Sequence, residues 1–331
     1  MPDLKTSYMG ISLRNPIIAG ASPLTSRIDT IKRLEDAGAA AVVTASLFEE
    51  QIQLERHELA EGQERYDNIS AEAVTTFPRG EHAGPEEHLM WVRKTKEAVK
   101  IPVIGSLNAV TPATWTTWAK RLAETGVDAL ELNFYARPTD LGRTGAEVER
   151  EQIDVLGSIL KSVSIPVSVK LSVHYSNPLN FIKQLDAKGV KGFVLFNRFF
   201  QPDIDVDKLE HVNKLNLSEP NDSRLPLRYA GMLYRELAGD VCASTGIADG
   251  ESVAKMLLAG ASCVQCASAL IRNKPPHVTL MLKSLEGWMQ KKGFASIADF
   301  RGKLSRASSK DPWAYLRAQY VRIVMSRPPS L

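Results

Sequence analysis

Eight short apolar runs recur along this chain, and a segment of helical character follows each of them. The runs lie at 15–19, 40–44, 102–105, 129–133, 166–170 and 192–197, and the last two lie within 241–251 and 258–270. Because the runs are apolar throughout, they predict parallel strands that are buried on both faces. Repeating β–α order is typical of a closed barrel or of a doubly wound sheet. Eight units favour the (β/α)8 (TIM) barrel.

A recurring glycine motif supports the repeated unit. Predicted helices cover 27–37, 85–99, 112–124, 146–163 and 179–188, and the same small motif closes several β–α units. Its glycines are Gly38, Gly126, Gly189 and Gly260. In each motif a helix ends, the glycine permits a left-handed cap, and a strand follows.

Two long insertions and a tail interrupt this rhythm. Residues 48–84 follow the second strand, residues 198–225 follow the sixth, and the segment 275–331 is predicted to be a helical extension. Both insertions leave from the carboxyl ends of strands, where such barrels hold their active sites. Long loops there are usually lids or interface elements, although exposed loops without a role are the alternative. We expect one barrel domain over residues 1–331.

The last two units point to a phosphate site. Each strand ends in a turn of small residues, Ser-Thr-Gly at 244–246 and Cys-Ala-Ser-Ala at 266–269. Adjacent turns of this kind bring free backbone N–H groups and a helix N-terminus to one place, which is how these barrels bind phosphate. The alternative is that the glycines only cap helices and tighten loops.

Nearly every predicted strand ends in a small or polar residue. Neutral amides offer donors and acceptors to a flat heterocycle, and a cation stabilises negative charge on it. A buried strand lysine can instead form a structural ion pair. Together with the phosphate turns, this ring of strand-end residues suits flavin mononucleotide (FMN). Its members are Ala21, Ser22, Thr44, Ser106, Asn108, Asn133, Lys170, Asn197, Thr245, Gly246, Ala267 and Ser268.

Composition narrows the partners. The chain has 331 residues and a net charge of +3 without a basic block, so charge does not indicate nucleic acid. Cys263 and Cys266 would point to opposite faces of a strand, which argues against a redox pair, a metal site or an iron–sulfur cluster. Since neither a signal pattern nor a membrane-length run is seen, we expect a cytoplasmic protein that does not enter a membrane.

At this point the chain resembles the dihydroorotate dehydrogenases, FMN-containing (β/α)8 barrels, and especially a dihydroorotate-dehydrogenase-like subgroup. The resemblance covers Leu4 to about Arg272 and rests on the order and spacing of several motifs. They are the segment 10–23, Glu131-Leu-Asn, Val167-Ser-Val-Lys-Leu, Asn197, and Ser244-Thr-Gly-Ile through Ser268-Ala-Leu.

The resemblance implies roles for individual residues. Ala21 and Ser22 would line the flavin edge, and Thr44, Asn108 and Lys170 would contact the isoalloxazine ring. Thr245, Gly246 and the turn holding Ala267 and Ser268 would bind the phosphate, while Asn133 and Asn197 would lie beside both flavin and substrate. Family members act in pyrimidine biosynthesis and are commonly dimers, so the resemblance also implies a homodimer.

The departures from the family pattern concern the substrate. The family continues after Glu-Leu-Asn with a segment whose Cys or Ser removes a proton, whereas Ala136 stands at that position here. Pro138 replaces the orotate-binding Asn, and the family's second lysine is missing because Ala45 follows Thr44. The flavin contacts are therefore expected to be kept, while recognition of dihydroorotate is not assured.

Another group must then accept the proton. Tyr135 is adjacent to Ala136, but its ordinary pKa of ~10 requires a nearby cation such as Lys170 or Arg137. His174 has the better intrinsic pKa for neutral pH, although an exposed loop histidine is often only solvated. Arg137 could bind a carboxylate substrate as a fork, or form a surface ion pair.

Three functions remain open. The first is an FMN-dependent oxidoreductase acting on a CH–CH bond of a small polar substrate, a carboxylate among the candidates, with electrons passing to a soluble acceptor or a partner redox protein. The second is a barrel for a phosphorylated metabolite, such as an aldolase with Lys170 as its Schiff-base nucleophile. The third is a flavoprotein subunit without turnover.

Overall fold

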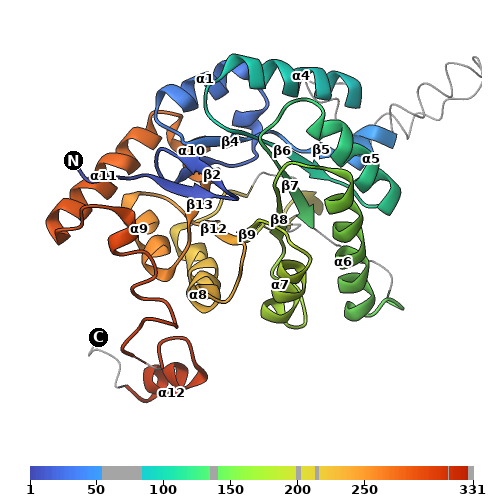
Figure 1. The fold of residues 1–331 in the computed structure, drawn as a ribbon. Helices are drawn as coiled ribbons and strands as arrows, with labels where there is room; N and C mark the ends of the chain where they lie inside the picture. The colour runs from blue at the N-terminus through green and yellow to red at the C-terminus, as the bar shows by residue number, and fades with distance from the viewer. Residues whose placement is uncertain (54–83, 135–140, 199–202, 213–215, 312, 327–331) are drawn as a thin grey trace, which may run out of the picture.

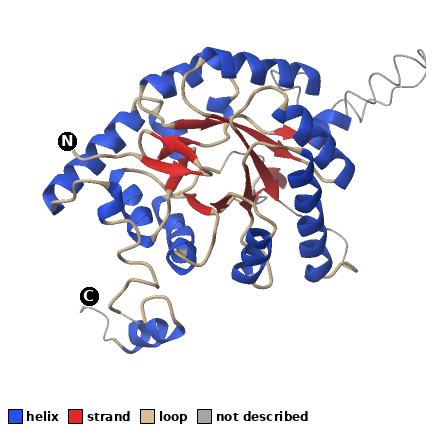
Figure 2. Cartoon of the chain, viewed as in Figure 1, coloured by secondary structure: helices blue, strands red, loops and turns tan. Residues whose placement is uncertain are grey.

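The computed structural model describes residues 1–53, 84–134, 141–198, 203–212, 216–311 and 313–326. Eight parallel strands form a closed barrel within a ring of helices (Figures 1 and 2). Each strand is hydrogen-bonded to its neighbour in the sheet. The barrel is closed because the second and third barrel strands also pair with each other, which joins the two ends of this row of strands. The strands are β3 (Ile17–Ala19), β4 (Ala41–Val43), β6 (Val103–Asn108), β7 (Ala129–Phe134), β8 (Val167–Leu171), β9 (Gly192–Leu195), β12 (Asp240–Ser244) and β13 (Cys263–Cys266). The predicted TIM barrel is confirmed.

Burial explains why these segments form strands. Every residue of β3, β4, β7, β8, β9 and β13 is buried, as expected for strands covered by helices outside and by packed side chains inside. A register that pairs Leu130 with Val167 and Lys170 with Val194 carries the polar strand ends to one mouth of the barrel.

The helices begin and end where local chemistry permits. Proline occupies the first position of three of them, and Thr111, Thr144, Asn177 and Asp249 each accept a backbone N–H as the N-cap. The predicted left-handed glycines all have positive φ, from 91° at Gly126 to 126° at Gly260. The ring comprises α1 (Ile28–Asp36), α4 (Pro85–Ala98), α5 (Pro112–Ala123), α6 (Gly145–Ser162), α7 (Pro178–Ala187), α8 (Arg224–Leu233), α9 (Gly250–Ala259) and α11 (His277–Lys292).

An N-terminal hairpin, which we did not predict, seals the other end of the barrel. It consists of β1 (Thr6–Tyr8) and β2 (Ile11–Leu13), and Tyr8 at its tip is buried. A side chain at Gly192, where β9 begins, would collide with the Tyr8 ring and with Met9. The ligand-accessible end is therefore the mouth at the carboxyl ends of the strands.

The insertions lie at that mouth. The first contributes β5 (Leu47–Phe48), which pairs with β6, while residues 54–83 lie outside the described residues. The second contains an antiparallel hairpin, β10 (Asp203–Asp205) and β11 (Glu210–Val212), and the turn η2 (Pro220–Ser223) that leads into α8. Two further short elements are the turns η1 (Pro23–Thr25) and η3 (Ile297–Asp299).

The C-terminal segment divides into two parts. Its first part, α11, packs beside α9 as the eighth helix of the ring, preceded by the short α10 (Ser268–Asn273). Its second part runs through η3 to α12 (Arg317–Met325), which lies apart from the ring (Figure 1). Hence part of the predicted extension completes the barrel.

Candidate active site

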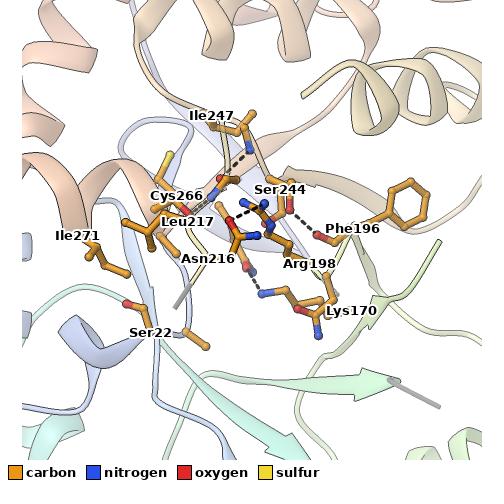
Figure 3. Close-up of a pocket in the computed structure, with 18 of the residues that line it drawn as sticks. Ser22, Lys170, Phe196, Arg198, Asn216, Leu217, Ser244, Ile247, Cys266 and Ile271 are labelled. Carbon is orange, nitrogen blue, oxygen red and sulfur yellow. Dashed lines mark hydrogen bonds between the residues drawn. The ribbon is translucent and has the colours of Figure 1, made fainter. Parts of the chain in front are cut away.

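A cavity of about 300 Å³ opens at the barrel mouth between β8, β9, β12 and β13 (Figure 3). Its size is at the lower end of the range for small-molecule sites. Side chains from six segments far apart in the sequence line it. They are Ala21, Ser22, Pro23, Lys170, Phe196, Asn197, Arg198, Asn216, Leu217, Ser218, Ser244, Thr245, Gly246, Ile247, Gln265, Cys266, Ala267, Ser268 and Ile271.

Ser218 ties the two small-residue turns together at one end of this cavity. Its N–H donates to Ser268 Oγ at 2.9 Å, and its Oγ accepts from the Gly246 N–H at 3.2 Å. Arg272 donates to the Ser218 carbonyl at 2.9 Å and pairs with Glu219 at 2.5 Å. The turns after β12 and β13 are therefore held side by side, as a phosphate site requires.

Gly246 cannot carry a side chain in this arrangement. Its φ is +74°, and a Cβ would overlap the backbone nitrogen of Ser223 and meet the Glu219 carbonyl oxygen at 2.9 Å. The preceding Thr245 also has a positive φ, and its Oγ1 donates to the Phe196 carbonyl at 2.9 Å. The glycine thus allows η2 to close over the turn, which the sequence motif alone did not reveal.

Arg198 supplies a cation to the same cavity. Its Nη2 donates to Asn216 Oδ1 at 3.2 Å (Figure 3). Its Nη1 lies 3.4 Å from Asp222 Oδ2. That Nη1 is buried and makes no hydrogen bond within the described part of the chain. Asp222 is within ion-pair distance of this Nη1 but does not accept a hydrogen bond from it, so an anionic ligand in the cavity would supply the missing acceptor.

Lys170 approaches the cavity from the barrel interior. Its Nζ donates to Gln265 Oε1 at 3.4 Å and lies 3.8 Å from Glu131 Oε1, while Gln265 Nε2 donates to the other Glu131 oxygen. Glu131 is fully buried. Burial raises the pKa of its carboxyl, against the opposing effects of the Lys170 charge and the Gln265 hydrogen bond.

Hydroxyl and amide groups join the ends of β4, β6 and β7. Asn133 Nδ2 donates to Ser106 Oγ at 2.9 Å and to Ser46 Oγ at 3.2 Å, and the two hydroxyls lie 2.7 Å apart. Thr44 Oγ1 accepts the Ser106 N–H at 3.1 Å. Because these groups satisfy one another, the network fixes Asn133 at the mouth beside Lys170, its partner in the β7–β8 register.

A second cavity of about 590 Å³ shares the wall formed by Ala21, Ser22 and Pro23. Ala45, Ser46, Phe48 and Gln51 line its far side, together with Ser26, Arg27 and His88. The mouth therefore offers space on both sides of the loop that follows β3.

The predicted site residues fall into four groups. Eight line the first cavity, namely Ala21, Ser22, Lys170, Asn197, Thr245, Gly246, Ala267 and Ser268. Thr44 and Asn133 are buried in the hydroxyl–amide network, and Asn108 ends β6 opposite Phe48. His174 is exposed and does not line the first cavity. Tyr135 and Arg137, with Ala136 and Pro138, lie outside the described residues.

Several residues of the site were missed. Glu131 was noted only as part of a motif, and Gln265 was passed over although a polar residue inside an apolar strand is an available signal. Arg198 directly follows Asn197 and was missed because only the residues that end the predicted strands were considered. Ser218 gave no signal, because its role depends on the insertion folding back over two turns.

A closed (β/α)8 barrel whose last two strands end in paired small-residue turns, with a buried lysine at the same mouth, is typical of enzymes that bind phosphate-bearing ligands. The dihydroorotate dehydrogenase family pattern matches residues 3–289. The chain belongs to this family, whose members are flavoproteins and oxidoreductases that act on a CH–CH bond.

Individual relatives agree with this placement. The dihydroorotate dehydrogenase B (NAD(+)) catalytic subunit of Thermoplasma volcanium is 29% identical over 310 residues, covering 91% of this chain and 98% of the relative. A putative dihydroorotate dehydrogenase A (fumarate) of Aeropyrum pernix is 30% identical over 68% of this chain and 74% of the relative. The chloroplastic dihydropyrimidine dehydrogenase (NADP(+)) of Arabidopsis thaliana is 22% identical over 91% of this chain and 76% of the relative.

Two structural features are absent from the described residues. Within them, helices that are both long and apolar enough to cross a bilayer do not occur. The same residues hold no group of three or more His, Cys, Asp or Glu side chains arranged to bind a metal ion.

Proposed function

We propose that this protein binds FMN at the barrel mouth and oxidises or reduces a CH–CH bond of a small polar ring. One observation carries the proposal: a single cavity has a phosphate-type cradle at one end and the Lys170 ammonium at the other. The Nη1 of Arg198, which makes no hydrogen bond within the described part of the chain, fits an anion at the cradle.

The chain's own residues would divide the work. The turns around Gly246 and Ser268, with Arg198, would bind the phosphate through N–H donors and charge. Lys170 would place its cation at the pyrimidine end of the ring, held there by Gln265 and Glu131. Ala21 and Ser22 would pack at the flavin edge, where small side chains leave room for a flat ring. Bound FMN supplies the hydride acceptor or donor.

Thr44, Asn108 and Asn133 are proposed to act from the opposite wall. Asn133 is fixed by Ser106 and Ser46, so its amide is already oriented at the mouth when ligands arrive. Thr44 is fully buried and does not line the first cavity. We therefore propose that it holds Ser106 in place beside the position of the flavin ring.

The substrate class follows from the relatives and from the departures. Relatives are named for dihydroorotate and for dihydropyrimidine, both reduced pyrimidine rings. Because Ala136 cannot take a proton, we propose that Tyr135 or His174 accepts it, and that Arg137 and Asn197 bind the substrate. We therefore propose a reduced pyrimidine or a similar polar ring, with dihydroorotate and a role in pyrimidine biosynthesis as the first case to test.

Electrons must leave the flavin in each cycle. Relatives are named as the catalytic subunit of an NAD(+)-linked enzyme, which implies a further subunit in those proteins. We propose a soluble acceptor or a partner redox protein in the cytoplasm for this chain.

The first experiment is an absorption spectrum of the purified protein, followed by anaerobic addition of dihydroorotate. We expect flavin absorption, FMN released on denaturation, and bleaching on addition of dihydroorotate or another reduced pyrimidine. A yellow protein that no reduced pyrimidine bleaches would favour the flavoprotein subunit without turnover. A colourless protein that does not take up FMN would reject the proposal. It would favour the alternative function, a barrel that binds a phosphorylated metabolite.

Comparison of Tyr135→Phe with His174→Asn then identifies the proton acceptor. The variant that loses flavin reduction while keeping its FMN spectrum carries the role. If both variants are reduced at the wild-type rate, neither residue is the base.

A further inference from the structure

Glu131 is a buried carboxylate that lies behind the two polar side chains at the inner end of the first cavity. It belongs to β7 and has no exposed surface. Lys170 and Gln265 line the cavity, whereas Glu131 does not. Its Oε2 accepts a hydrogen bond from Gln265 Nε2, and its Oε1 lies 3.8 Å from Lys170 Nζ. Glu131 would therefore act on a ligand in the cavity through Lys170 and Gln265, without touching it.

The contact between Lys170 and Glu131 leaves both groups with unused bonding capacity. An ammonium has three N–H donors, and within the described residues Lys170 Nζ makes one hydrogen bond, to Gln265 at 3.4 Å. Glu131 Oε1 accepts no hydrogen bond within the same residues. At 3.8 Å the two charges attract each other without a hydrogen bond to fix their separation. Lys170 can thus direct its other donors to a ligand.

The other titratable side chains near Glu131 are neutral. They are Tyr8, from β1, and Cys242, from β12. Burial raises the pKa of both groups, and the Glu131 charge raises it further, so neither ionises near neutral pH. Cys263, which pairs with Cys242 from β13, is fully buried as well. Among these described neighbours, Lys170 supplies the positive charge and Glu131 the negative charge.

The charge state of Glu131 decides how much positive charge the cavity receives. With Glu131 ionised, the pair with Lys170 has no net charge. With Glu131 neutral, Lys170 presents its full charge to the cavity, and charges removed from water act more strongly than at a surface. Reduction adds negative charge to a bound flavin. A cation beside the ring therefore favours the reduced form, and a carboxylate behind that cation disfavours it.

We propose that Glu131 is a positioning residue that lowers the reduction potential of the flavin by neutralising Lys170 from behind. The inference rests on the proposed function and adds a control over how readily the flavin passes electrons on. Two electrons move between the CH–CH bond of the substrate and the flavin, and Glu131 exchanges no electron and forms no covalent bond. A lower potential favours transfer to the acceptor over retention of the electrons on the flavin.

The reduction potential of FMN bound to the full-length protein, measured against dyes of known potential, tests this role. Glu131→Gln removes the charge and keeps the shape. It should favour the reduced form at least tenfold, a positive shift of about 30 mV for a two-electron couple. Glu131→Asp keeps the charge but withdraws it by one methylene. It should give a smaller shift of the same sign, and it replaces Glu131→Gln if that variant does not fold.

Glu49→Gln is the matched control. It makes the same change at a second buried carboxylate, which does not line the first cavity and does not pair with Lys170. Its hydrogen bonds run to the Val110 and Thr111 N–H groups instead. The potential of the bound flavin should therefore stay at the wild-type value in this variant.

A pH profile separates the charge of Glu131 from its shape. Burial raises the pKa of this carboxyl above its ordinary 4.5, so the negative charge is lost as pH falls through the raised value. Protonated glutamate then resembles glutamine in charge. The difference in potential between wild type and Glu131→Gln should therefore shrink from neutral pH down to pH 4.5.

Three results would overturn the inference. They are an unchanged or lower potential in Glu131→Gln, an equal shift in Glu49→Gln, and a difference that stays constant down to pH 4.5. The comparison uses variants whose FMN spectrum matches that of wild type, so each of these results leaves the proposed function standing. A wild type that binds no FMN rejects the proposed function and this inference together.

Discussion

The Lys170 ammonium lies 3.8 Å from the Glu131 carboxylate inside the barrel, and Gln265 bridges the two side chains. Glu131 is fully buried and Lys170 is 9% exposed, so both charges are largely removed from water. Desolvation of an ion pair is offset only when the partners stay together. The pair therefore fixes where the cation sits at the mouth.

We expect the two partners to be energetically coupled. Glu131→Gln leaves the lysine without a counter-charge and Lys170→Met leaves the carboxylate unpaired, so each should cost about 3–5 kcal/mol of unfolding free energy. The double substitution should cost clearly less than the sum, as measured by urea unfolding of all four proteins. Simple additivity would show that the side chains do not interact.

Gly246→Ala should separate a steric effect from a backbone effect. Gly246 and Gly126 both have positive φ, but a Cβ at Gly126 meets nothing within 4 Å, whereas one at Gly246 overlaps Ser223. Gly126→Ala should therefore cost only about 1–2 kcal/mol for the left-handed backbone. Gly246→Ala should cost more unfolding free energy and should also release FMN. Urea unfolding measures the first effect and flavin fluorescence measures the second. Equal losses in both variants would contradict the close approach of η2.

Arg198→Gln tests the cation at the cradle. Loss of a charge-assisted hydrogen bond to phosphate should raise the Kd for FMN about tenfold, equivalent to about 1.4 kcal/mol. The matched control Arg224→Gln removes the same charge from an exposed residue at the start of α8, outside the first cavity. Titration of each flavin-free variant with FMN gives its Kd. An equal effect of the two substitutions would indicate long-range electrostatic attraction instead of a direct contact between Arg198 and the phosphate.

Glu49 should make the free energy of unfolding depend on pH in the acid range. It is buried, and although burial acts to raise its pKa, the N–H groups of Thr111 and Val110 lower it below the ordinary 4.5. A carboxyl with a lowered folded-state pKa stabilises the fold above pH 4.5, and this stabilisation is lost as pH falls through the lower value. The stability gap between wild type and Glu49→Gln should thus be constant near neutrality and shrink below pH 4.5. Parallel stability curves down to pH 3 would exclude this role.

Sequence patterns were sufficient where a residue's role depends on its near neighbours. Gly38, Gly126, Gly189 and Gly260 were predicted to be left-handed from motifs of a few residues, and all have positive φ. The strands were predicted from apolar runs, because a strand buried on both faces tolerates little else. Strand ends such as Lys170 and Asn197 could be placed at one mouth, since parallel strands share their direction.

Long-range contacts decided what the sequence patterns left open. Ser218 joins two turns only because a 28-residue insertion folds back over them, and Glu131 becomes the partner of Lys170 only through the register of β7 and β8. The amino-acid sequence by itself determined the β–α repeat, the closed barrel and the set of strand-end side chains, because burial and backbone geometry act locally. Only the tertiary structure decided which charges are paired, which donors lack acceptors and which apolar side chains face water, because these depend on segments that closure of the barrel brings together.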